Sequence, residues 1–272
     1  MRKERRSQTY ETPPPRRAFR KLLFAVTTAA ALAGNAPGVS AEEQSSSGWK
    51  FNVSPYLWAA GISGTVGTLP GLPPADIDAS FSDIWDDLQF AGMIAGGARK
   101  DRFSIAGDLQ YVHTEGNDDS LAPIFGSEKL TSKTFIFSAL GEYLILERDR
   151  TNLFVSGGLR VWSVDTELEL STGTLPGRTI KGDDTWVDPL IGVRGSVDLG
   201  QSNVFFTGWS YVGGFGVGSE IMADLFGGFG YRFTETISAT MGYRWMKVDR
   251  DDGGFVYDVV QQGVMVGASF RF

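Results

Sequence analysis

Nine charged residues lie on the polar side of segments in which apolar and polar residues alternate. They are Arg160, Arg194, Arg232, Arg244, Arg271, Asp108, Glu142, Asp188 and Asp224. Because an ionised group in a confined interior is costly unless it is paired, these residues predict salt bridges across the inside of a closed sheet. Two interpretations stay open: a ladder of ion pairs that rigidifies the interior, for which arginine is well suited, and a constriction whose opposed charges select permeating ions.

The chain has one histidine and no cysteine, which limits the catalysis that it could perform. His113, with Glu115 two residues on, lacks an Asp-x-His or His-x-Ser arrangement and shares a face with Tyr111. A serine hydrolase would therefore lack its base. Cysteine nucleophiles and thiolate metal sites are excluded, and P-loop, dinucleotide-binding and zinc spacings are absent. We expect no enzyme, no catalytic residue, no metal and no cofactor.

The strands that must position these charges are clearest at the carboxyl end, in 255–272. One face there is apolar and the other small or polar: Val264, Val266, Ala268, Phe270 and Phe272 alternate with Gly263, Met265, Gly267, Ser269 and Arg271. A period of two indicates a strand whose faces meet different media, and a tilted membrane-spanning strand needs roughly 9 to 11 residues. The alternative is the edge strand of a soluble sandwich, whose uncovered apolar face would aggregate.

The same alternation predicts ten strands, at 49–63, 89–99, 102–114, 132–146, 152–165, 185–199, 203–216, 219–233, 236–249 and 254–272. Short connections at 100–101, 147–151, 200–203 and 234–236 alternate with longer ones at 64–88, 115–131 and 166–184, and with compact ones at 217–218 and 250–253. This pattern is typical of an all-β, antiparallel up-and-down transmembrane β-barrel. Eight strands is the alternative, because the compact connections leave the count open there.

Alternation also assigns faces, with two exceptions. In 203–216, the face that contains Phe205 and the face that contains Phe206 are both apolar enough to contact lipid. The orientation of this strand therefore stays open. In 49–63, Pro55 cannot donate to a ladder, so we expect a bulge or a break there.

Aromatic residues near strand ends on the outer face predict the two interfacial girdles of a membrane barrel: Trp49, Phe103, Tyr143, Tyr231, Phe233, Trp245 and Phe272.

The amino end predicts export. Eight Lys and Arg residues precede an apolar run from Leu22 to Ala33, and Val39-Ser40-Ala41 offers small residues at a cleavage site. This run has 12 residues, whereas a membrane anchor needs about 20. We expect a signal peptide at 1–41, a short periplasmic linker at 42–48 and a barrel at 49–272.

Removal of residues 1–41 leaves 231 residues with a formal charge of −13. Such an acidic chain is a poor partner for nucleic acid, because phosphate binding needs a basic face. Many of the carboxylates fall in the expected loops: Asp118, Asp119, Glu167, Glu169, Asp183, Asp184, Asp251 and Asp252. A solvated surface explains them, and divalent cations shared with lipopolysaccharide are the alternative.

One helix is expected, in the first long connection. Phe81, Ile84, Trp85 and Leu88 fall on one face of a two-turn amphipathic helix, and Ser80 with Asp83 resembles a capping box with Asp in place of Glu. It would plug the mouth of the barrel or lie on its outer rim, since so short a helix needs packing.

Several motifs together resemble a family of uncharacterised porin-like outer-membrane β-barrel proteins of Gram-negative bacteria. They are the leader, Tyr56-Leu57-Trp58, the stretch from Phe81 to Phe90, Gly213-Gly214-Phe215-Gly216, Gly242-Tyr243-Arg244 and the terminal Phe-Arg-Phe. The resemblance covers 42–272 and carries no catalytic residues, although some small barrels are proteases or lipid A-modifying enzymes.

The resemblance implies a location and partners. It implies an outer-membrane protein with extracellular loops and periplasmic termini, in contact with lipid and lipopolysaccharide. The final residues, Phe270 and Phe272, resemble the signal that the barrel-assembly machinery reads in such proteins. We expect a narrow passive, porin-like pore, and the alternative is a non-conducting structural or adhesin-like barrel. The oligomeric state is left open.

Overall fold

The computed structural model describes residues 48–118, 124–148 and 150–272. The expected signal peptide and most of the linker lie outside these residues, as does Asp119. The described part is a sheet of eleven strands, in which ten long strands follow one another antiparallel around a ring and the remaining one, β2, is short. The ring strands are β1 (Trp49–Gly67), β3 (Leu88–Lys100), β4 (Phe103–Asp118), β5 (Phe125–Arg148), β6 (Thr151–Thr172), β7 (Arg178–Asp198), β8 (Val204–Gly214), β9 (Ile221–Arg232), β10 (Ile237–Asp252) and β11 (Phe255–Arg271).

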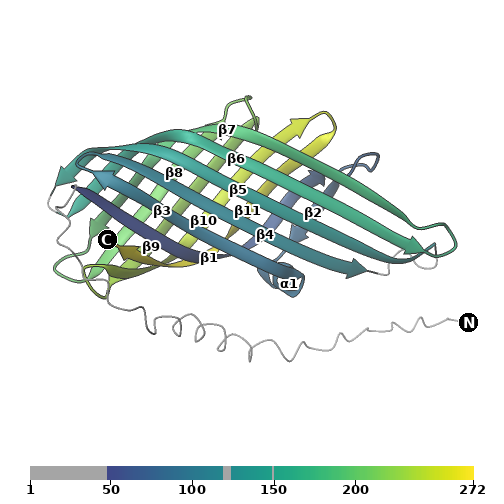
Figure 1. Ribbon diagram of the computed structural model, residues 1–272, viewed down its shortest axis with the longest axis horizontal. Coiled ribbons are helices and arrows are strands. Elements are labelled where there is room, and N and C mark those ends of the chain that lie inside the picture. Colours follow the sequence, from purple (N-terminus) through teal and green to yellow (C-terminus); the bar gives the residue numbers. More distant parts are fainter. Residues whose placement is uncertain (1–47, 119–123, 149) are drawn as a thin grey trace, which may run out of the picture. The chain divides into compact units, whose positions relative to one another are not determined.

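The last strand closes the ring by pairing with the first (Figure 1). In the register of β1 and β11, Val53 lies opposite Phe270. At the end of this pair, Phe51 and Phe272 donate backbone hydrogen bonds to each other's carbonyl oxygens, at 3.2 and 3.0 Å. Closure leaves no free edge along this side of the sheet. The predicted barrel and its ten long strands are confirmed, and the alternative of eight strands is wrong.

The wall is interrupted between β1 and β3. β3 pairs with β1 only as far as Pro55 and Ile94, and farther along β1 pairs with β2 (Ala75–Ala79), from Ile62 to Val66. The expected break at Pro55 is therefore present, but without a bulge, because the register of β1 with β11 is the same on both sides of it. The sequence did not predict β2, which lies in the first long connection.

The expected helix, α1 (Phe81–Asp86), joins β2 to β3. Asp83 closes the predicted capping box: its amide donates to the Ser80 hydroxyl, and its carboxylate accepts from the Ser80 amide at 2.9 Å. The start of the helix lies against Gly61 of β1, where a Cβ atom would approach the Ala79 carbonyl oxygen to 2.9 Å. No side chain of α1 is buried, so it does not plug the lumen. No helix in the described part of the chain is long and apolar enough to cross a membrane.

The two faces of the wall differ as the alternation predicted. Large apolar side chains are exposed on the outside, among them Leu57, Phe103, Ile105, Leu159, Ile191, Phe229, Met241 and Val266, whereas the buried side chains point inward. The register with β9 settles the orientation of β8, because directly paired residues share a face: Tyr211 lies opposite Asp224, so Phe205, Trp209 and Tyr211 point inward. An apolar outer band is the arrangement that a lipid environment requires. The interior combines buried apolar and aromatic side chains with a smaller number of charged ones.

Three neighbouring strands are much longer than the rest. β5, β6 and β7 have 24, 22 and 21 residues, against 11 and 12 for β8 and β9. At about 3.3 Å per residue and a tilt of about 40°, 22 residues rise roughly 55 Å, about twice the height of a lipid-facing band of about 25 Å. The extension, 125–133 with 165–172 and 178–184, continues the barrel wall at the loop end, and the end of β4, 113–118, pairs along its edge (Figure 1). We call this extension the ribbon.

The connection after β1 packs against the β7 strand of the ribbon. Thr68 is buried, and a Cβ atom at Gly182 of β7 would lie 1.8 Å from the Thr68 carbonyl oxygen. β1 and β7 stand five places apart in the ring, so this contact spans the loop end of the lumen. Only glycine permits so close an approach of two backbones here.

Candidate functional site

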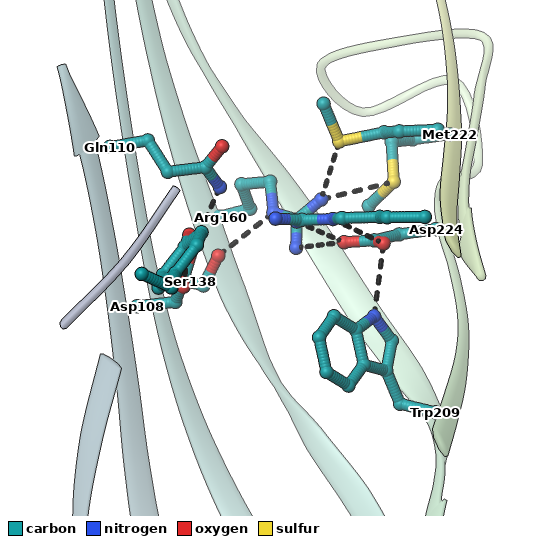
Figure 2. Close-up of polar contacts among 10 residues, drawn as sticks. Asp108, Gln110, Ser138, Arg160, Trp209, Met222 and Asp224 are labelled. Atoms are coloured by element: carbon teal, nitrogen blue, oxygen red, sulfur yellow. Dashed lines mark hydrogen bonds and ion pairs between the residues drawn. The ribbon is translucent and has the colours of Figure 1, made fainter. Parts of the chain in front are cut away.

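A buried carboxylate lies at the centre of the lumen. Asp224 of β9 accepts hydrogen bonds from Arg160 of β6 at 2.7 Å and from Arg244 of β10 at 3.0 and 2.7 Å (Figure 2). It also accepts from the indole Nε1 of Trp209, at 3.0 Å. Asp224 is fully buried and both guanidinium groups are 2% exposed, so these charges interact with one another and not with bulk water. Such interactions are charge-assisted and strong.

Arg160 spans the lumen from β6 and is held on two sides. Its Nε donates to the Ser138 hydroxyl at 2.8 Å, while its Nη1 points to the thioether sulfurs of Met222 and Met246, at 3.6 and 3.3 Å (Figure 2). Thioethers are weak acceptors, so the guanidinium group as a whole depends on Asp224, through Nη2, and on Ser138, through Nε, for the compensation of its lost hydration.

A second carboxylate completes the cluster. Asp108 of β4 accepts from the Tyr56 hydroxyl and from the Gln110 amide, each at 2.7 Å. Tyr56 reaches it from β1 across β3, which places the small side chain of Ala95 opposite Asp108. We call Asp108, Arg160, Asp224 and Arg244 the central belt, because their charges balance and they come from four strands on different sides of the ring.

The central belt belongs to a layer of buried side chains that fills most of the lumen. Nine of the ten ring strands contribute an inward side chain that is at most 8% exposed: Tyr56, Gln110, Leu140, Arg160, Leu190, Tyr211, Asp224, Arg244 and Met265. A water-filled path would leave its lining exposed. In this conformation, therefore, side chains fill most of the lumen at this level, and the inward residues beside β3, among them Ala95 and Asp108, remain partly exposed.

Toward the short turns, the same residue types are hydrated. Arg194 binds Glu142 through two nitrogens, with Nε at 2.8 Å, and its side chain is 40% exposed. Arg232 pairs with Asp198 at 2.6 Å, and both side chains are 27% exposed. Water therefore enters this end of the lumen as far as Arg194. We call this hydrated region the turn-end mouth.

Two residues of the predicted ladder have other surroundings. Asp188 accepts from the amide and the hydroxyl of Ser219, at 2.6 and 2.9 Å, and contacts no arginine among the described hydrogen bonds and ion pairs. Asp188 and Arg194 are too far apart to pair, because six residues along β7 separate them by about 20 Å. Arg271 points inward at the turn end without an ion pair in the described part of the chain.

The aromatic residues of the predicted girdles lie on the outer face. Trp49, Phe103, Tyr143, Tyr231 and Phe233 are exposed near the turn end, where Phe103 and Tyr143 pack edge to face at 5.0 Å. Trp245 lies farther along its strand, opposite Gln262. Phe270 and Phe272 are exposed at the end of β11. Their roles as membrane anchors and as an assembly signal stay predictions.

Several partners in the belt were missed at the sequence level. Tyr56, Gln110, Ser138 and Trp209 bind its charges, yet none of them carries a charge itself. All four point inward, and each side chain carries a polar group. These two features together could have identified them. His113, by contrast, points outward, with its Nε2 3.5 Å from Glu115. Within the described ranges, no three potential ligands converge as for a metal ion.

No protein-family model matches the sequence, and no curated protein sequence matches it either. Among solved structures, the fold is similar to the translocator domain of the autotransporter NalP from Neisseria meningitidis, with a TM-score of 0.50 at 12% identity, over 85% of this chain and 90% of that one. The chain has the fold of an outer-membrane β-barrel. Lower scores relate this barrel to the outer membrane protease OmpT from Escherichia coli (TM-score 0.48, 10% identity, 82% and 96% covered) and to Ail, the attachment invasion locus protein of Yersinia pestis (0.37, 11%, 83% and 99%).

Proposed function

We propose that this barrel resides in the outer membrane, is closed to ions in its resting state, and acts at the cell surface through the ribbon. The layer of buried side chains around Asp224 is the observation that carries the proposal. Side chains that fill the lumen stabilise the barrel from within. The exposed ribbon is then the part of the molecule that a partner can contact. The protein works without catalysis, as a surface-interaction barrel.

The ribbon supports an interaction role by its composition and its length. One of its faces carries charges of both signs: Lys129, Lys133, Glu167, Glu169 and Lys181. Lys181 binds Glu167 at 2.7 Å, and Lys129 binds Glu115 at 3.1 Å. An exposed sheet of mixed charge favours polar, water-mediated recognition of the kind found at the rims of protein interfaces.

The orientation follows from the unequal ends of the barrel. The ribbon and the longer connections share one end, while Trp49 and Phe272 lie at the end with short turns. In bacterial barrels the short turns face the periplasm. We propose that the ribbon is extracellular and that Phe272 faces the assembly machinery during insertion.

Protease treatment of intact cells tests this orientation. Trypsin added outside should cut at Lys181, whose side chain is 67% exposed, and should spare Lys100 in the turn between β3 and β4. Permeabilised cells provide the control in which Lys100 becomes accessible. Cleavage at Lys100 but not at Lys181 in intact cells would contradict the proposed orientation.

A narrow pore is the second candidate, and the hydrated Arg194 favours it. Water already reaches this side chain from the turn end, so the barrier is the layer of side chains between it and the loop end. Movement of Arg160 or Arg244 would be enough to open a charged constriction, which would select ions by charge. Conductance in planar bilayers separates the candidates: discrete, salt-dependent steps support the pore, and their absence supports the closed barrel.

A further inference from the structure

The turn end carries a cluster of positive charges that the ion pairs of the lumen do not use. Lys50 of β1 lies directly opposite Arg99 of β3 in the antiparallel register. Like charges directly opposite each other destabilise a sheet. The mature chain has an excess of acidic residues, so this juxtaposition of two cations is not a consequence of composition.

Part of this charge is neutralised within the chain. The Arg99 guanidinium binds Glu147 at 3.1 Å and donates from Nε to the Asp101 carbonyl oxygen at 2.9 Å. Lys50, by contrast, forms no ion pair with any residue that the structure describes. Its ammonium group therefore has spare capacity for an external anion.

A hollow of about 300 Å³ lies at these side chains, lined by Gly48, Lys50, Arg99, Asp101, Arg102 and Glu147. Three cations face two carboxylates there, which leaves one positive charge. Lys50 and Arg99 lie on the inward face, where the Arg99 guanidinium is 5.4 Å from the ring centroid of the buried Phe154, so the hollow opens toward the turn-end mouth. Trp49 and Phe103 are exposed on the opposite, lipid-facing side of the wall. Aromatic residues of this kind lie at the level of lipid headgroups.

We propose that this hollow binds a phosphate group. A phosphodiester carries one negative charge, which matches the one uncompensated positive charge, and guanidinium groups suit phosphate oxygens in geometry. Two sources have this chemistry: the headgroup of an anionic phospholipid at the membrane surface, and a soluble phosphate in the surrounding water. The inward position of the hollow, across the wall from the outer aromatic residues, favours the soluble phosphate. The proposal is independent of whether the lumen conducts.

The test uses the folded protein in detergent, with fluorescent phosphatidylglycerol and inorganic phosphate as separate probes. The double variant Lys50→Gln/Arg102→Gln should weaken the binding of inorganic phosphate by about tenfold, because it removes two of the three cations that surround the bound anion. Lys100→Gln is the matched control: this cation is at the same end but does not line the hollow, and it should bind as the wild type does.

The outcomes separate the two sources. Saturable binding of phosphatidylglycerol that millimolar inorganic phosphate does not displace identifies the lipid. Displacement by phosphate, together with direct phosphate binding that the double variant loses, identifies the soluble source. If wild type and double variant bind both probes alike while both show the gel shift of a folded barrel when unheated, the proposal is overturned. Loss of binding in Lys100→Gln equal to that of the double variant would also overturn the proposal. The residues that line the hollow would then contribute no more to binding than another cation at the same end of the barrel.

Discussion

The central belt and the turn-end mouth contain the same residue types in different surroundings. In the belt, Asp224 and its two arginines are almost completely excluded from water, whereas Arg194 and the pair Arg232–Asp198 remain hydrated. A buried ion pair is costly to break, because the remaining charge has no water to replace its partner. A hydrated pair contributes roughly 0 to 1 kcal/mol. The degree of hydration, more than ion pairing itself, therefore determines which charged residues stabilise the barrel and which are free to bind a ligand.

The largest effect is expected from Asp224→Asn. The amide keeps the shape of the side chain but leaves the Arg160 and Arg244 guanidinium groups without their common counter-ion. The free energy of unfolding in lipid vesicles, measured with urea, should fall by about 3 to 5 kcal/mol. Asp198→Asn at the hydrated pair is the control and should change it by less than about 1 kcal/mol. Equal losses in both variants would remove the distinction between the two regions.

Arg244→Ala should have the next largest effect. Asp224 keeps Arg160 and the Trp209 indole as partners, so the loss in free energy of unfolding should be near the lower end for a broken buried pair, about 3 kcal/mol. The same urea titration measures it. A loss below about 1 kcal/mol would show that water enters the belt and hydrates the stranded carboxylate.

Arg194→Ala tests the boundary between the two regions. It strands the buried Glu142 carboxylate, which keeps only a long hydrogen bond from Ser156 at 3.4 Å. Because water already reaches this depth, we expect a loss of about 1 to 3 kcal/mol, the cost of an unsatisfied polar group. A loss as large as that of Asp224→Asn would place Arg194 in the layer of buried side chains.

The smallest effect is expected outside the barrel, at α1. Hydrogen bonds from the Ser80 hydroxyl and amide lower the pKa of the Asp83 carboxyl. The capping contribution is therefore fully present above the ordinary aspartate pKa of about 3.9 and is lost as the pH falls through the lowered value. NMR titration of the Asp83 carboxyl carbon should show a depressed pKa in the wild type and a value closer to the ordinary one in Ser80→Ala. Identical titration curves for the two proteins would contradict the cap.

Alternation predicted the ring strands and most of their faces because the two sides of the wall meet different media. It could not predict β2, whose five residues lie in a connection that lacks a sustained period. It also left the orientation of β8 open, because aromatic residues occupy both faces of that strand. The register with β9, and not the residues of β8, determines that Trp209 reaches Asp224.

The alternation along each strand identified which ionised residues point inward, but not which of them form pairs. Asp188, Arg194 and Glu142 all point inward, yet only the last two meet. Pairing depends on depth along the barrel axis, which strand tilt and stagger set together, and these follow from the whole sheet. The contact of Thr68 with Gly182 could not be predicted from the sequence for a similar reason, since it joins a loop to a strand on the opposite side of the ring.

Conductance of the wild-type protein in planar lipid bilayers tests the closed lumen most directly. Protein whose unheated gel mobility shows that it is folded should give no discrete current steps at neutral pH in concentrated salt, because buried side chains fill the lumen around Asp224. Reproducible, salt-dependent single-channel steps from the same folded protein would contradict the account.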